Sequence, residues 1–147
     1  MRHPKILYLL ADGARARFVE RSPQTEHFVT IAEIDARDRL ERLRHELRGS
    51  PPVANRQSGT PQRHAVGPDT FVRDAKEAFA AEVADRAAEV CRKGEYLSIF
   101  IAAPSRLTGP IQQRLEGKAI VSGVLEKDLT KSPDETLETW LGGLTAA

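Results

Sequence analysis

Three strand-like segments follow one another near the start of the chain, with only short turns between them. The segments cover residues 5–11 (KILYLLA), 15–21 (RARFVER) and 27–35 (HFVTIAEID). The first is a continuous apolar run, as in a buried strand, and the other two alternate apolar with polar residues. Asp12-Gly13 and the sequence Ser-Pro-Gln at 22–24 supply turn residues. Because short turns join strands that run in opposite directions, the pattern predicts an antiparallel meander.

Helices alternate with strands in the second half of the chain. We expect a long helix at 69–94, a buried strand at 96–103, a short helix at 105–117, a strand at 118–128 and a last helix from 132 to 144. The long helix has Asp69 as its cap and Gly94 as its stop. Its apolar stripe consists of Phe71, Ala75, Ala78, Phe79, Val83, Ala87, Val90 and Cys91. The last helix opens with a capping box at Ser132-Pro133-Asp134-Glu135 and continues with Leu137, Trp140, Leu141 and Leu144.

An arginine-rich stretch and a long loop separate these two halves. Leu40, Leu43 and Leu47 are spaced as on one face of a short helix. Residues 49–69 contain three glycines and four prolines and show no period, which indicates a loop. A loop of this length is uncommon within a compact domain unless it is functional or disordered.

This order of elements predicts an α/β fold. Three antiparallel strands followed by αβαβα is the order of a ribonuclease H-like mixed sheet of five strands with helices on both faces. A chain of 147 residues suits one domain, so we expect residues 1–147 to form a single unit that carries the arginine-rich helix and loop at about 36–69. Fold alone assigns no chemistry.

Composition favours a soluble cytoplasmic protein. Apolar residues make up 40% and charged residues 29% of the chain, and no apolar run is long enough to span a membrane. Asp12 interrupts the first apolar run too early for a signal peptide. The single cysteine, Cys91, cannot form an internal disulfide, and its helical neighbours predict that it is packed.

Catalytic chemistry has one candidate position, at the end of the first strand. A metal-dependent nuclease or hydrolase needs several carboxylates around divalent ions, and Asp12 lies where such a site would begin. Only Glu126 and Asp128 are placed to join it, because the central strand ends without an acid. Asp12 equally fits the acceptor of a tight turn. The chain has no nucleotide-binding loop and no Cys/His cluster, so we predict no metal and no cofactor.

Basic residues gather in the first half of the chain. Residues 1–68 carry a net charge of +4 and residues 69–147 a net charge of −3, and residues 36–64 hold seven arginines against three acids. Arginine suits bidentate contact with phosphate, so this region is a candidate surface for RNA or an acidic partner. The alternative is an exposed face whose arginines pair locally with Glu41 and Glu46. The candidate contact residues from this argument are Arg15, Arg17, Arg42, Arg44 and Arg48.

Three segments together resemble the host attachment protein family, the proteins required for attachment to host cells. They read LLADGARARFVE (9–20), APSRLTGPIQQRL (103–115) and VSGVLEKDLTKSPDETLETWL (121–141). Within them, ADGARAR and KDLTK are the most specific parts. The resemblance to this bacterial family spans nearly the whole chain, in the family's order, and is weakest at residues 35–68. That family is in turn similar to the middle domain of archaeal and eukaryotic peptide release factors, which has a ribonuclease H-like fold.

The release-factor resemblance bears on the long loop. The release-factor domain carries a Gly-Gly-Gln tip before its long helix, whereas this chain has QSGTPQRHA at 57–65. Hydrolysis of peptidyl-tRNA is therefore not implied. The resemblance implies a loop that faces RNA or the ribosome, through Arg56, Gln62, Arg63 and His64. In KDLTK, Lys131 is a further candidate contact, although Asp128 there also fits a simple turn.

These observations leave three hypotheses for function. The first is a non-enzymatic host attachment family protein that acts by binding a partner. The second is a release-factor-like domain that binds RNA or the ribosome. The third is a metal-dependent hydrolase that uses Asp12 with Glu126 or Asp128.

Overall fold

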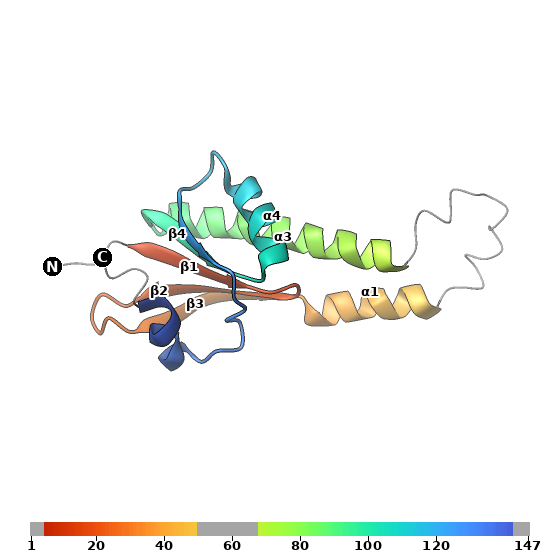
Figure 1. The fold of residues 1–147 in the computed structure, drawn as a ribbon, viewed down its shortest axis with the longest axis horizontal. Helices are drawn as coiled ribbons and strands as arrows, with labels where there is room; N and C mark the ends of the chain where they lie inside the picture. The colour runs from red at the N-terminus through yellow and green to blue at the C-terminus, as the bar shows by residue number, and fades with distance from the viewer. Residues whose placement is uncertain (1–4, 50–67, 143–147) are drawn as a thin grey trace.

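A five-stranded mixed sheet forms the centre of the protein (Figure 1). The computed structural model describes residues 5–49 and 68–142. The strands lie in the order β3-β2-β1-β4-β5. Their bounds are β1 Ile6–Ala11, β2 Arg15–Arg21, β3 Phe28–Asp35, β4 Ser98–Ala102 and β5 Val121–Leu125. The predicted α/β class and the five-strand mixed sheet are confirmed, and the strand order is compatible with the ribonuclease H-like description.

The chain adds strands toward one edge of the sheet after β1 and toward the opposite edge after β4. β1 pairs antiparallel with β2, placing Tyr8 opposite Val19, and β2 pairs antiparallel with β3. On its other side β1 pairs in parallel with β4, and β4 with β5. From β1 the chain therefore moves to one edge of the sheet, and from β4 it moves to the other. The loops that follow these two central strands emerge side by side at the same end of the sheet.

One face of the sheet is covered by helices α3 (Pro68–Lys93) and α4 (Ser105–Leu115). Leu7, Leu9 and Ala11 of β1 face this side, because alternate strand residues point to the same face. They pack in a core to which α3 contributes Phe79, Ala80, Val83, Ala84, Ala87 and Cys91, and α4 contributes Leu107, Ile111 and Leu115. Cys91 is buried as predicted, and burial raises the pKa of its thiol.

The opposite face is covered by the last part of the described chain. Tyr8 and Leu10 of β1 pack there against Leu137 and Leu141. The regular helix predicted after residue 132 is wrong. A 3-10 turn, η2 (Asp134–Thr136), is followed by a π-helical turn, η3 (Glu138–Gly142). The predicted capping box does not form, since η2 begins after Pro133 without a side-chain cap and Asp134 bonds instead to β2 and β3.

Helix α1 (Arg37–Gly49) and the first half of α3 extend beyond the sheet, side by side (Figure 1). We call this pair of helical segments the arm. Arg39 of α1 and Glu82 of α3 join the two helices with a 2.9 Å ion pair. Ala78, which was predicted to be part of the buried stripe of α3, is exposed because the sheet does not reach this part of the helix. Among the residues of α3 whose burial is described, the fully buried stripe begins at Phe79, and the predicted stripe residue Phe71 lies outside that set.

Two further expectations concern the long helix and the membrane. α3 begins at Pro68, one residue before the predicted cap Asp69, and proline at the first position of a helix is favourable. Within the described residues, no helix combines the length and the apolar character needed to cross a membrane.

Candidate functional site

The turn between β1 and β2 is built around the carboxylate of Asp12. Its Oδ1 accepts hydrogen bonds from the backbone N–H groups of Ala14 (2.7 Å) and Arg15 (2.6 Å). The backbone N–H of Asp12 in turn donates to the carbonyl of Arg15 at 2.9 Å. A short acidic side chain that satisfies the backbone of its own turn is a recurrent use of aspartate. The sequence prediction that Asp12 turns the first strand into the second agrees with this geometry.

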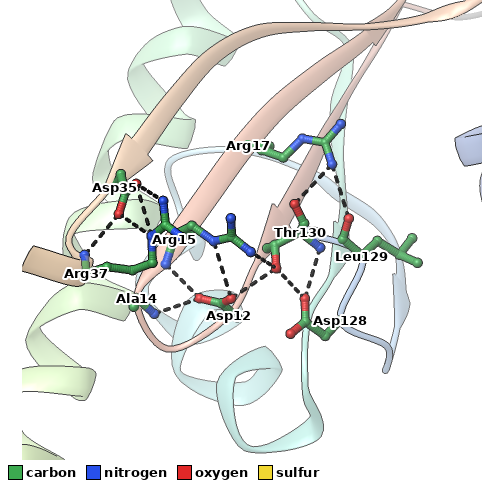
Figure 2. A network of polar contacts seen from close by, with 9 residues as sticks. All are labelled: Asp12, Ala14, Arg15, Arg17, Asp35, Arg37, Asp128, Leu129 and Thr130. Carbon is green, nitrogen blue, oxygen red and sulfur yellow. Dashed lines mark hydrogen bonds and ion pairs between the residues drawn. The ribbon is translucent and has the colours of Figure 1, made fainter. Parts of the chain in front are cut away.

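The other oxygen of Asp12 reaches a threonine far along the chain (Figure 2). The hydroxyl of Thr130 lies 3.0 Å from Oδ2 of Asp12 and 2.5 Å from Oδ1 of Asp128. Arg15 approaches the same hydroxyl at 3.5 Å, and the backbone N–H of Thr130 donates to Asp128 at 2.9 Å. Thr130 is buried and therefore joins the first turn of the sheet to the segment that follows β5. Asp12 and Asp128, predicted as possible partners, do meet at this hydroxyl.

Arg17, two residues after Arg15 in β2, donates hydrogen bonds to groups inside the protein. Its guanidinium donates to the backbone carbonyls of Leu129, Thr130 and Ser132. It also donates to the side chains of Thr30 and Asp134. Arg15 and Arg17 face the same side of the sheet, as alternate strand residues must. Arg17 is only 9% exposed, so its charge is neutralised internally.

Asp134 completes this network from the start of η2. Burial opposes its ionisation, but hydrogen bonds from the hydroxyl and backbone N–H of Thr30, together with Arg17, outweigh burial and lower the pKa of Asp134. Asp134 therefore links β2 and β3 to the chain that covers the second face of the sheet. This explains why the segment 128–134 lies across the strands although it has little regular structure.

We expect the contribution of Asp134 to stability to disappear in acid. A carboxylate whose pKa is lowered by folding stabilises the protein fully above its ordinary value of 3.8, and that stabilisation is lost as the pH falls through the lower folded value. The difference in the free energy of unfolding between the wild type and Asp134→Asn should be constant near neutral pH and shrink below about pH 4. Urea unfolding at a series of pH values measures it, with the exposed neighbour variant Glu135→Gln as the control. A difference that persists unchanged in acid would contradict this assignment.

The remaining predicted site residues are distributed over several places. Glu126 is exposed just after β5 and has no contact with the Asp12 network, and Lys131 is exposed next to Thr130. Arg42 and Arg44 lie on α1, and Arg44 pairs with Glu41 at 3.2 Å. The side chain of Arg48 and the residues Arg56, Gln62, Arg63 and His64 lie outside the described part of the chain.

The sequence did not predict three polar residues of the network as partners of Arg17 or Asp12. Thr30, Thr130 and Asp134 carry no motif that marks them as partners of Arg17 and Asp12. The spacing Asp128-Leu-Thr130 was a usable signal, because an aspartate two residues before a threonine commonly accepts its backbone N–H. The long-range partners have no such local signal, since they are separated from β2 by more than 100 positions in the chain.

The network offers little for metal chemistry. Both oxygens of Asp12 accept hydrogen bonds, and one of them is also 3.8 Å from Nε of Arg15. Across residues 5–49 and 68–142, no group of three or more His, Cys, Asp or Glu side chains is placed to hold a metal ion. Next to the network, hydrogen bonds from Arg37 lower the pKa of Asp35 to about 2. Asp12 and Asp35 are thus both engaged with donors from the protein.

A known protein family matches most of the chain, including the network described above. A family model described as protein required for attachment to host cells matches residues 7–141. The chain belongs to this family. No curated protein matches the chain significantly. The range matched by the host attachment family begins in β1 and ends in η3, so it contains every residue of the network that joins Asp12, Arg17, Thr130 and Asp134.

Proposed function

We propose that this host attachment family protein acts by binding a protein partner through the arm, without catalysis. The observation that carries the proposal is a groove of about 450 Å³ between α1 and α3. The groove is lined by the segments of α1 and α3 that extend beyond the sheet (Figure 1). Grooves between helices are common binding sites, and apolar ones with a few polar groups suit protein segments.

The lining of the groove combines apolar side chains with a charged rim. Leu40 and Leu43 of α1 face Ala75, Ala78 and Phe79 of α3. The charged side chains at the rim are Arg39, Arg42, Glu46 and Glu82. This composition fits an amphipathic helix, because its apolar face would cover the leucines and its polar edges would meet the charged rim, which carries both signs of charge.

The charges on α1 favour a protein partner over RNA. Arg37 pairs with Asp35, Arg39 with Glu82 and Arg44 with Glu41. Among the described arginines of α1, Arg42 alone has no acidic partner. Nucleic-acid binding draws most of its affinity from unpaired cations that neutralise phosphates, and the described part of α1 offers few. The RNA- or ribosome-binding interpretation rests on residues 57–65 and on the resemblance to release factors, and it remains the alternative.

Substitution at Ala78 tests the arm directly. We expect a photo-reactive side chain at position 78 to cross-link a partner protein in the native lysate, and ribonuclease treatment to leave the product unchanged. With the captured partner purified, Ala78→Glu should weaken binding about tenfold, because it places a charge on the apolar floor. Ala78 is exposed, so the variant should fold. Gln112→Glu on the exposed face of α4 adds the same charge outside the groove and serves as the matched control.

Two results would count against a protein partner at the arm. One is a cross-linked product that disappears with ribonuclease, accompanied by binding that weakens steeply with salt, which supports the RNA interpretation. The other is equal affinity for the wild type and Ala78→Glu, which would place the contact surface elsewhere.

A further inference from the structure

We propose that the end of the sheet between the loops after β1 and β4 binds a phosphate group, held by Lys76 and Arg106 near the backbone of Gly13. This site is separate from the groove of the arm. It lies at the end of the sheet where the two central parallel strands finish. The proposal assigns a small anionic ligand, whereas the arm is proposed to bind a protein.

Two cations from different helices converge on Gly13. A Cβ atom built at Gly13 would lie 3.7 Å from Cδ and Cε of Lys76, and 3.9 Å from Nη2 of Arg106. Lys76 belongs to α3 and Arg106 to the first turn of α4. Cε of Lys76 carries the ammonium group, so both cationic groups lie near Gly13, and an anion bound there would offset their mutual repulsion.

Neither cation has an acidic partner among the described residues. The nearby acids are already engaged, since Asp12 accepts bonds from its own turn and from Thr130, and Asp35 is paired with Arg37 at 2.7 Å. Two other cations at the junction of α3 and α4, Arg114 and Lys118, are paired with Asp85 at 2.9 and 3.0 Å. Lys76 and Arg106 therefore stand beside Gly13 without an acidic partner among the described residues.

The position in the fold favours a ligand site. In open α/β sheets, ligands bind outside the carboxyl ends of parallel strands at the point where the chain turns to opposite edges. In this sheet that point lies between β1 and β4. The loop after β1 provides Gly13 and the loop after β4 leads to Arg106. The first turn of α4 carries no acid that would compete with a bound anion.

The donors suit a phosphate group. A guanidinium and an ammonium group together offer several N–H donors to the oxygens of one phosphate. The absence of a side chain at Gly13 lets an oxyanion approach the backbone between the two cations. The same chemistry serves free phosphate and a phosphate that is part of a nucleotide, and the titration below separates these sources.

Titration of the full chain with inorganic phosphate tests the site. We expect saturable shifts of the backbone amide signal of Gly13 in a ¹H–¹⁵N spectrum, at an ionic strength kept constant with chloride. Lys76→Gln and Arg106→Gln should each weaken binding about tenfold, the usual scale for loss of one charge-assisted hydrogen bond. Arg86→Gln removes an exposed cation elsewhere on α3 and should bind phosphate as the wild type does.

Gly13→Ala separates binding from folding. Its Cβ would make ordinary van der Waals contacts, and Gly13 has no positive φ, so alanine fits the backbone. The variant should fold with unchanged stability and bind phosphate more weakly, because its methyl group lies between the two cations. Adenosine monophosphate serves as a second probe, and tighter binding than inorganic phosphate would identify a nucleotide as the source. The proposal is overturned if neither probe binds saturably, or if Lys76→Gln and Arg106→Gln bind as the wild type does.

Discussion

Replacing Arg17 with methionine is expected to lower the free energy of unfolding by about 3 to 5 kcal/mol, the range for removing one member of a buried ionic network. The side chain of Arg17 has only 10% of its surface exposed. The variant would leave the carbonyls of Leu129 and Thr130 without this donor, and Asp134 without its cation. Equilibrium unfolding in urea, followed by circular dichroism, measures the loss.

The matched control for this variant is Arg86→Met, which removes an exposed arginine of α3. Surface substitutions of this kind change stability by about 0.5 kcal/mol or less. Hydrogen exchange adds a local readout, because loss of Arg17 should increase exchange first in the segment 128–141. Equal stability of the two variants would show that Arg17 does not hold this segment in place.

Replacing Asp12 with alanine is expected to destabilise the protein by about 2 kcal/mol, whereas Asp12→Asn should cost less than about 1 kcal/mol. Alanine removes the acceptor for the backbone N–H groups of Ala14 and Arg15. Asparagine keeps an oxygen at the same place and preserves the turn. Thermal unfolding of the two variants beside the wild type measures both effects.

Glu126→Ala is the control for Asp12, since Glu126 is the exposed third carboxylate of the hydrolase interpretation. It should leave stability unchanged. The hydrolase hypothesis makes a different prediction, namely metal-dependent cleavage that Asp12→Asn abolishes while the protein stays folded. Finding such cleavage would assign Asp12 to catalysis in addition to its place in the turn.

The fold was largely predictable because its signals are local. The alternation in RARFVER gave β2 with its observed bounds, and the apolar run around Ile99 gave the central strand β4. The turn dipeptide Asp12-Gly13 marks a short connection between two strands by its residue types alone. The helix prediction failed over residues 132–142, where local capping preferences compete with bonds to Arg17 and Thr30. Those bonds are made by residues distant in sequence, and they decide the conformation of Asp134.

The candidate sites were only partly predictable. The sequence suggested that Asp12 and Asp128 are close, but Thr130, which joins them, had no role in that argument. Arg17 was a candidate contact for RNA, and the structure shows it buried. Lys76 and Arg106 stood out in no pattern, because neither belongs to a motif and only the packing of α3 and α4 brings them to Gly13.

The sequence by itself determined the order of strands and helices, the α/β class and the resemblance to the host attachment family, since periodicity, turns and short motifs are read within a few residues of each other. The tertiary structure alone decided which charges are neutralised and which remain available. The sequence alone does not show which acids, if any, pair with Arg17 or with Lys76. Folding surrounds Arg17 with carbonyls and Asp134, and leaves Lys76 beside a second cation, because charge pairing depends on distances between segments that lie far apart in the chain.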